Sequence, residues 1–251
     1  INDIKPSFLK IASGEITNGP LLLQHAMADK PVIISSGMSS LKEIEEALAI
    51  IAFALINRPS IYPTPELIDQ AYCSERGQAL LKEKVTLLHC TTEYPAPLDE
   101  VNLKAMETMQ ASFGLSVGYS DHTEGIAVPI AAVAMGAKII EKHFTLDKSL
   151  RGPDHAASIE PAELTAMVKA TRAVEKAKGS SMKLPTISEL CNRDIARRSI
   201  VAAQPIKAGE KFTASNLSTK RPGSGLSPMQ YWQIIGTTSD RDYQPDDAIE
   251  S

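Results

Sequence analysis

Short apolar segments rich in β-branched residues alternate with segments of helical spacing along the N-terminal part of this chain. After the second apolar run, Ser40 and Glu43 form a capping-box pattern, and apolar residues follow at helical spacing. A later helix is predicted between Pro161 and Gly179, which suit the start and the end of a helix. Near-continuous apolar strands that alternate with helices are typical of a parallel sheet covered on both faces. The predicted strands are 8–13, 31–36, 84–90, 114–120 and 137–144.

Every predicted strand has polar residues at its C-terminal end. In a (β/α)8 barrel these ends form one face of the molecule, and the active site lies there. A doubly wound sheet also binds ligands at strand ends, but only around its switch point. Polar residues at all of the strand ends therefore favour the barrel. They occupy positions 13–15, 35–37, 91–94, 120–122 and 141–143.

The sequence contains fewer strand–helix units than a complete barrel. The first residue is Ile1 rather than Met, and a strand is predicted almost at once. We therefore expect about three units to precede Ile1 in a larger protein. A partial sheet would leave the hydrogen-bonding groups of an edge strand unpaired. The chain by itself is not expected to be a complete catalyst.

Composition changes mark the domain boundaries. Residues 1–178 are predicted to form the C-terminal part of the barrel, and 179–197 a linker. Short strand patterns and turn signals then predict a small, mostly β domain over 198–251. Within the barrel part, the segment 58–78 contains three prolines, and we expect it to be an inserted surface loop.

Composition excludes several classes of function. The formal net charge is −4 with both signs mixed, and there is no basic cluster, so a nucleic-acid surface is not expected. The apolar run 47–56 is shorter than the ~20 residues of a membrane span, and the first residues lack the apolar core of a signal peptide. Three irregularly spaced cysteines give neither a disulfide framework nor a zinc knuckle. We expect a soluble cytoplasmic protein.

Two histidines follow neighbouring predicted strands. His122 ends the fourth strand and His143 the fifth, and adjacent strands lie ~4.8 Å apart, so their rings can converge on one metal ion. Two nitrogens without a nearby thiolate suit Mn²⁺, Fe²⁺ or Zn²⁺ better than Mg²⁺. Asp121 and Glu141 would then orient the rings. The alternative is that both histidines are structural. We expect a structural role for His25, which lies on a helix, and for His89, which lies within a strand.

A lysine and several hydroxyls form a candidate anion site. Lys10 lies on the first strand, where a charge is costly unless it faces an anion. Hydroxyl groups at the strand ends surround it, a combination that suits a phosphate group. Each hydroxyl taken alone also fits a helix cap. The hydroxyls belong to Ser13, Ser35, Thr92 and Ser120.

Three further residues are candidates for chemistry or for sugar binding. Glu15, beside the predicted metal and anion sites, is a candidate general acid or base, although it also suits the N-terminus of a helix. Asp154 follows a Gly-Pro turn and could bind sugar hydroxyls or simply complete the turn. Tyr94, which precedes Pro95, is a second candidate sugar contact.

These motifs together resemble the sialic acid synthase family, which condenses phosphoenolpyruvate with N-acylated amino sugars. The resemblance implies a (β/α)8 barrel followed by a small antifreeze-like (SAF) domain. It also implies that the family's first three strands, with further phosphoenolpyruvate contacts, have no counterpart here. The matching segments are KIASGE, PVIISSGM, LLHCTTEYPAP, VGYSDHT, GAKIIEKHF, GPDH, RRSIVA and KRPGSGLSP.

The resemblance also implies roles for individual residues. His122 and His143 would bind a divalent metal, typically Mn²⁺, with Mg²⁺ or Co²⁺ as alternatives. Glu15 would be the central acid or base, while Tyr94 and Asp154 would face the sugar. The residues that would contact phosphoenolpyruvate are Lys10, Ser13, Ser35 and Ser120.

The resemblance extends to assembly and substrate. Arg221 would reach the sugar N-acyl group in a neighbouring subunit, which implies a homodimer whose SAF domains cover the partner's barrel. Many sialate synthases have Asn where this chain has Thr92, and 90–106 together with the proline-rich segment look more like the legionaminate branch. The product would be a nine-carbon 2-keto sugar acid, legionaminic or sialic. The alternatives are another phosphoenolpyruvate-dependent aldose-condensing barrel, such as the pseudaminate type, or a non-catalytic carbohydrate-binding remnant.

Overall fold

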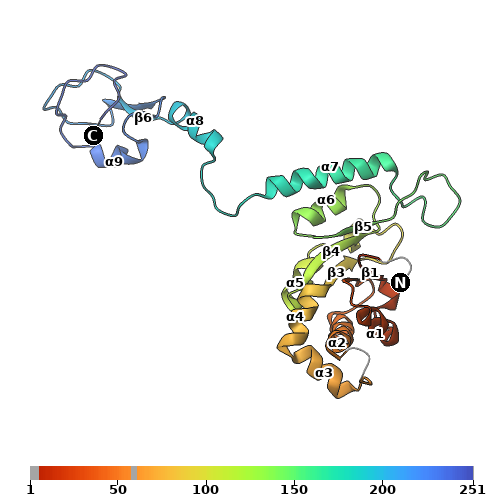
Figure 1. Ribbon diagram of the computed structural model, residues 1–251. Coiled ribbons are helices and arrows are strands. Elements are labelled where there is room, and N and C mark those ends of the chain that lie inside the picture. Colours follow the sequence, from red (N-terminus) through yellow and green to blue (C-terminus); the bar gives the residue numbers. More distant parts are fainter. Residues whose placement is uncertain (1–5, 58–60, 251) are drawn as a thin grey trace. The chain divides into compact units, whose positions relative to one another are not determined.

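The computed structural model describes residues 6–57 and 61–250. The chain divides into two compact units, Ile1–Gly179 and Ser180–Ser251, and each is described by itself (Figure 1). The boundary therefore falls at the start of the predicted linker 179–197. Within that predicted linker, helix α8 (Ile187–Ala196) forms, and it belongs to the second unit.

The first unit contains a parallel sheet in which the strands follow one another in chain order. β1 pairs with β2, β2 with β3, β3 with β4 and β4 with β5, each time in parallel. A doubly wound sheet reverses its strand order at the switch point, whereas a barrel does not. The observed order therefore confirms the strands and the barrel arrangement. The strands are β1 (Leu9–Ile11), β2 (Val32–Ser35), β3 (Val85–Cys90), β4 (Ser116–Asp121) and β5 (Ile140–Lys142).

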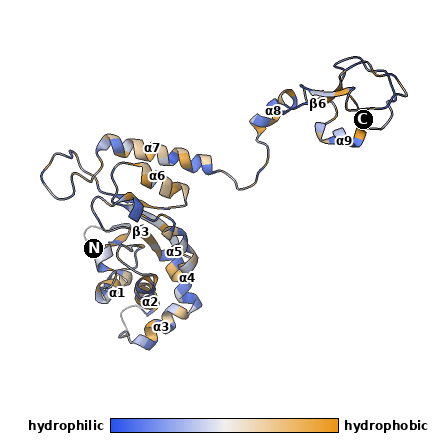
Figure 2. Ribbon diagram, turned by 180° about the vertical axis from the view of Figure 1, so that it is seen from behind, coloured by the Kyte–Doolittle hydropathy of each residue, from blue (hydrophilic) through white to orange (hydrophobic). Residues whose placement is uncertain are grey.

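Helices cover the outer face of this sheet (Figure 1). The Ser40 backbone N–H donates to the Glu43 carboxylate at 2.8 Å, so the predicted capping box starts α2. Glu160 and Glu163 form another box at the start of α7, where Pro161 takes the first helical position. In Figure 2, α6 is almost wholly apolar, while α7 alternates between apolar and polar residues. These helices are α1 (Gly19–Met27), α2 (Leu41–Asn57), α5 (Ala105–Phe113), α6 (Ala127–Ala134) and α7 (Pro161–Lys178).

The prediction of a surface loop over 58–78 was wrong for most of its length. From residue 65 this segment forms α3 (Pro65–Cys73) and the start of α4 (Glu75–Lys84). Thr64 accepts the N–H of Leu67, and the proline occupies the first turn, where its missing N–H costs nothing. Residues 58–60 lie outside the described residues. Pro65 thus belongs to a helix start rather than to an extended loop.

A further strand-like contact continues the sheet beyond β5. Phe144 and Ile159 form a parallel bridge, in which the Ile159 N–H donates to the His143 carbonyl at 2.9 Å. The Thr145 N–H donates to the Ile159 carbonyl at 3.0 Å. A bridge with only one residue on each side leaves no pattern in the sequence, so this pairing was not predicted. It ties the segment that follows His143 to the start of α7.

The core of the first unit lies between the outer face of the sheet and the helices. Alternate strand residues, including Ile34, Leu87 and Tyr119, are almost fully buried against Leu48 and Ile51 of α2 and their neighbours. Burying such side chains contributes about 1.5–3 kcal/mol each. The other face of the same strands is left for the polar residues described below.

The second unit has a small core of its own. β6 (Ser199–Ala202) pairs antiparallel with β7 (Leu217–Lys220), and isolated bridges extend the β structure. The short helices η3 (Pro228–Gln230) and α9 (Tyr231–Ile234) follow. The core residues are Ile200, Ala202, Ile206, Phe212, Leu217, Tyr243 and Ile249.

Across residues 6–57 and 61–250, none of the helices combines the length and the apolar character that a membrane crossing requires.

Candidate active site

The ends of β4 and β5 separate their residues between two faces of the sheet. Tyr119 of β4 and Ile140 of β5 pack into the core on the helix side. Side chains alternate along a strand, so Ser120 and Glu141 lie on the opposite, inner face. There the Ser120 hydroxyl donates to Glu141 Oε1 at 2.7 Å. This inner face, at the carboxyl ends of the strands, carries the candidate site.

His122 and His143 come together as predicted from their positions. Their ring centroids are 5.4 Å apart with the planes at 87°, and the Tyr94 ring lies 4.2 Å from His122 and 5.2 Å from His143. His122 Nδ1 is 2.7 Å from the carbonyl oxygen of Thr91. Since a carbonyl only accepts, Nδ1 carries the proton, and Nε2 keeps its lone pair for a ligand.

The two rings fit a divalent metal ion. His143 Nδ1 lies 3.8 Å from Asp154 Oδ2, a contact that favours the same tautomer as in His122. Among the described residues there is no group of three or more His, Cys, Asp or Glu side chains that could hold a metal. The donor set is therefore two imidazole nitrogens, and water or substrate oxygens would complete the coordination of an ion such as Mn²⁺.

The carboxylates that were expected to orient the rings have other partners. Asp121 forms an ion pair with Lys142 on the outer face, at 2.6 Å. Glu141 accepts from Ser120 and lies 3.6 Å from Lys10 Nζ. Backbone carbonyl oxygen and Asp154 hold the rings instead, so this detail of the prediction was wrong. Strand alternation is the reason, because residue 121 points away from residue 122.

A close cluster of hydroxyls surrounds Gly37, directly after β2. The Gly37 N–H donates to Ser13 Oγ at 3.0 Å. A Cβ atom at Gly37 would lie 2.1 Å from Thr92 Oγ1 and 2.8 Å from Ser13 Oγ. The close approach of these groups thus requires a glycine. We call Ser13, Ser35, Gly37 and Thr92 the hydroxyl cradle.

Two hydroxyls of the cradle lack any partner among the described residues. Ser35 Oγ and Thr92 Oγ1 are both buried and make no hydrogen bond. A buried hydroxyl without a partner costs about 1–3 kcal/mol. A ligand with several acceptor oxygens, such as a phosphate, would remove that cost. Thr92 therefore supplies a donor in the position where many sialate synthases have Asn.

Lys10 lies on the inner face beside this cluster. Its Nζ lies 3.6 Å from Glu141 Oε2 and donates to the Ile11 carbonyl at 3.0 Å. Glu141 also accepts from Ser120. Lys10 and Ser120 are thus joined through one carboxylate, which holds the lysine near the strand ends.

Cys90 is a site residue that the sequence analysis did not single out. Its Sγ lies 3.8 Å from His122 Nδ1 and accepts from Ser13 Oγ at 3.6 Å. Burial by itself raises the pKa of the thiol, but the contacts with His122 and Ser13 outweigh it and hold the pKa below its ordinary value. Burial likewise lowers the pKa of His122, and its contacts with Cys90 and Thr91 raise it above the ordinary value. The alternation of side chains along β3 was the available signal, because it places Cys90 on the same face as the hydroxyls that follow this strand.

The remaining predicted residues are not all brought into contact. Glu15 is exposed at the end of η1 (Ser13–Glu15), just after β1, and accepts from Asn18 at 2.7 Å. Tyr94 and Asp154 contact the histidines, as described above. Arg221 belongs to the second unit, where its Nε donates to the Ala196 carbonyl at 2.8 Å.

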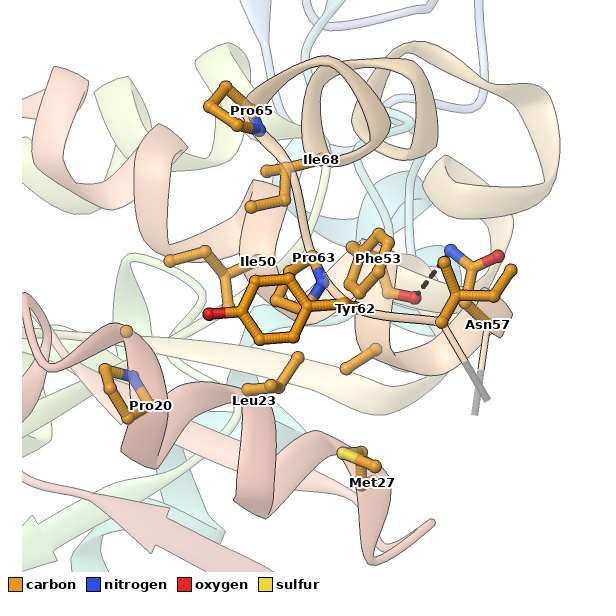
Figure 3. A pocket seen from close by; sticks show the side chains of 13 residues that line it. Pro20, Leu23, Met27, Ile50, Phe53, Asn57, Tyr62, Pro63, Pro65 and Ile68 are labelled. Atoms are coloured by element: carbon orange, nitrogen blue, oxygen red, sulfur yellow. Dashed lines mark hydrogen bonds between the residues drawn. The ribbon is translucent and has the colours of Figure 1, made fainter. Parts of the chain in front are cut away.

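A large cavity lies elsewhere in the first unit and has a different character (Figure 3). It has a volume of about 720 Å³ and is lined almost entirely by apolar side chains of α1, α2, α3 and the segment before α3. Its amide, Asn57, already donates to the Phe53 carbonyl at 3.2 Å. Among the described residues, the lining contains no His, Cys, Asp or Glu side chain, so the strand ends remain the candidate active site.

Comparisons with known proteins identify several sugar acid synthases as relatives of this chain. N,N'-diacetyllegionaminic acid synthase of Campylobacter jejuni is 45% identical over 99% of this chain and 67% of that protein. The enzyme of the same name from Legionella pneumophila is 43% identical over 91% of this chain and 58% of that protein. Pseudaminic acid synthase of C. jejuni is 32% identical over 98% of this chain and 64% of that protein. The chain thus spans about two thirds or less of the length of these relatives.

A solved structure supports the fold. The crystal structure of N-acetylneuraminic acid synthetase from Leptospira borgpetersenii, in complex with citrate, is 35% identical, covers 76% of this chain and 57% of that one, and has a TM-score of 0.61. The first unit is accordingly part of a TIM barrel. The SAF domain model matches residues 197–250, and the NeuB family model matches residues 1–183. The chain belongs to the NeuB family.

Proposed function

We propose that the full-length protein condenses phosphoenolpyruvate with an N-acylated amino sugar, giving a nine-carbon 2-keto sugar acid and phosphate. The observation that carries the proposal is the pairing of His122 and His143 beside the hydroxyl cradle, where buried donors lack partners. The greater identity to legionaminic acid synthase than to pseudaminic acid synthase favours a legionaminate-type substrate, 2,4-diacetamido-2,4,6-trideoxymannose, over N-acetylmannosamine or a pseudaminate-type sugar.

The cradle would bind the phosphate of phosphoenolpyruvate. Ser35 and Thr92 would donate their free hydroxyl protons. The Ser13 and Ser120 hydroxyls, which donate to Cys90 and Glu141 in this structure, would turn to the phosphate when it binds and add two more donors. Lys10 would offset the negative charge. Held in this way, the enol carbon C3 faces the sugar aldehyde, and positioning alone lowers the barrier of such a two-substrate reaction by several kcal/mol, about 7–11 at best.

The bond changes follow from the substrates. C3 of phosphoenolpyruvate forms a bond to the aldehyde carbon, the aldehyde oxygen takes up a proton, and positive charge develops at C2. Glu15 would take a proton from a water that adds to C2. The bond between C2 and the phosphate oxygen then breaks, the new C2 hydroxyl passes its proton to the departing phosphate, and the 2-keto group forms.

A divalent metal, most simply Mn²⁺, with Mg²⁺ or Co²⁺ as alternatives, would be held by His122 and His143. When bound it supplies a Lewis acid that polarises the aldehyde. Tyr94 and Asp154, which contact the same rings, would bind the sugar. Their position next to the metal pair supports that role.

Two further parts of the proposal concern assembly and location. We propose a homodimer in which Arg221 reaches the sugar N-acyl group in the partner's barrel. Arg221→Ala should then raise the KM for the sugar and leave the KM for phosphoenolpyruvate unchanged, and size-exclusion chromatography should show a dimer. Cys73, Cys90 and Cys191 are free thiols, in keeping with a reducing cytoplasm.

The test is phosphate release by the full-length protein. Phosphoenolpyruvate is supplied with each candidate sugar, and the trideoxymannose should give the largest kcat/KM. Preference for a pseudaminate-type sugar would reassign the substrate but keep the reaction. Tight sugar binding by calorimetry without phosphate release would instead favour a carbohydrate-binding protein. Undiminished turnover after changing both His122 and His143 to Ala would refute the metal role.

A further inference from the structure

A buried ion pair lies next in sequence to both candidate metal ligands. Lys142 Nζ is 2.6 Å from Asp121 Oδ2, and the two side chains are only 2% and 0% exposed. Lys142 also donates to the Thr123 carbonyl at 2.5 Å. The other oxygen of Asp121 accepts the N–H of Thr123 at 3.0 Å and its hydroxyl at 2.8 Å. Each charge therefore has more than one partner.

The pair joins the two strand ends that carry the histidines. Asp121 and Lys142 are direct neighbours in the register of β4 and β5. By alternation, the residues before and after each of them point to the inner face. Ser120 and His122 thus flank Asp121, and Glu141 and His143 flank Lys142. An outward contact holds together the two segments whose inward side chains form the site.

Stability alone is a poor explanation for this pair. Removing two charges from water costs several kcal/mol for each ion, and their attraction often does no more than offset it. An apolar pair of similar volume at such a position is often neutral or stabilising. The pair also differs from most of its surroundings on this face, where Ile140, Val117 and Leu87 pack in the apolar core.

We propose that Asp121 and Lys142 are positioning residues that set the register of the β4 and β5 ends, so that His122 and His143 present Nε2 to one point. The proposal rests on the proposed metal site. The position of the His143 ring should depend on the ion pair more strongly than the position of the His122 ring does. The His122 ring has its own short contact with the Thr91 carbonyl at 2.7 Å. Among the described residues, the His143 ring is held only by the longer 3.8 Å contact with Asp154 and by the neighbouring rings of Tyr94 and His122.

The experiment compares two variants of the full-length protein. Asp121→Asn/Lys142→Met removes both charges together and leaves no buried charge alone. Asp121→Asn removes only one charge: when the amide oxygen accepts from Thr123, the amide NH2 faces Lys142, so the buried lysine loses its counter-charge and the disturbance should be at least as large. The control is Lys148→Met, which breaks a lysine–glutamate pair of the same 2.6 Å length with Glu163, in which the side chains are 37% and 35% exposed.

The first measurement is the ¹H–¹⁵N spectrum of the histidine rings in metal-free protein, assigned with His122→Ala and His143→Ala. We expect the His143 ring signals to shift and broaden in the double variant and at least as much in Asp121→Asn, and to stay unchanged in Lys148→Met. The second measurement is Co²⁺ affinity, followed by visible absorption. It should fall about tenfold or more in the double variant, since partners beyond the ligands typically affect metal affinity by about 10–100-fold.

Unchanged ring spectra and unchanged Co²⁺ affinity in either folded variant would overturn the proposal. A pair that only stabilises the fold would lower the melting temperature and leave both readouts as they are, which also overturns it. The ring spectra require neither substrate nor metal. A wrong assignment of the sugar, or of the reaction, would therefore leave the expected spectral change intact.

Discussion

Replacing Gly37 by alanine tests the hydroxyl cradle most directly. The added Cβ would lie 2.1 Å from Thr92 Oγ1, whereas real Cβ contacts are not found below 3.0 Å. The Thr92 hydroxyl would therefore have to retreat by about 0.9 Å, and Ser13 Oγ, at 2.8 Å, by a smaller amount. Gly37 is not among the residues with positive φ, so alanine suits the backbone and the strain comes from these contacts alone.

The expected magnitude follows from that displacement. Losing the hydrogen bond of the displaced Thr92 hydroxyl to the phosphate would cost about 1–3 kcal/mol of binding free energy, and about 1.4 kcal/mol corresponds to a tenfold change in binding. If the cradle binds phosphate, the KM for phosphoenolpyruvate should rise about 5- to 150-fold, and the KM for the sugar should change little. The assay is phosphate release with one substrate varied at a time, together with a thermal melt.

A matched change and a rescue complete this test. In Gly19→Ala the Cβ would meet only the flexible end of Ile50 at 3.2 Å, in the apolar cavity wall, so both KM values should stay unchanged. Adding Thr92→Ser to Gly37→Ala removes the methyl group and frees the hydroxyl to turn, which should recover part of the affinity. A folded Gly37→Ala variant whose KM for phosphoenolpyruvate lies within twofold of the unchanged protein would refute the cradle.

Three more predictions follow from single contacts. Ser35→Ala removes a buried hydroxyl without a partner, so the melting temperature should stay equal or rise while the KM for phosphoenolpyruvate rises about tenfold; a lower melting temperature with unchanged KM would contradict this. His143→Ala should reduce metal-dependent turnover at least as strongly as His122→Ala, and the Mn²⁺ concentration needed for half-maximal turnover should rise in both; an unchanged Mn²⁺ requirement in both variants would show that the rings are not ligands. Burial lowers the pKa of His89 below its ordinary value of 6.5, against the contact with the Val101 carbonyl, so the neutral ring is favoured in the folded state. The unfolded chain then takes up the proton first, and urea titrations should show a free energy of unfolding that falls as the pH drops below about 6.5, a slope that His89→Gln should reduce.

Sequence patterns predicted the strands well because their periodicity and their polar ends depend on local chain direction. The apolar runs and the capping box of Ser40 and Glu43 led directly to β1–β5 and α2. The density of prolines predicted a loop where α3 forms, because a proline in the first turn of a helix looks the same in sequence as a proline in a loop. The pattern of Thr186 and Glu189 at the start of α8 was a capping box of the same kind, and it was the available signal for a helix inside the predicted linker.

Contacts through space could not be predicted in the same way. Gly37 and Cys90 gain their importance from the distance between β2 and β3 ends, which no single segment encodes. Asp121 was assigned to His122 because the two are adjacent in sequence. Alternation along the strand places them on opposite faces, and the partner of Asp121 is Lys142, 21 residues away.

At the ends of β4 and β5, the buried charge on each strand can be understood only together with the opposite charge on the other strand. Each end carries three polar residues in a row, of which the outer two point inward and the middle one outward. An outward charge would be costly under the helices unless an opposite charge lay across the strand gap. Asp121 and Lys142 occupy that one register position, so each makes the other tolerable. A register shift of a single residue would separate the buried charges and also part the two histidines. The free-energy cost of separating the buried charges therefore also disfavours the shift that would part the two histidines.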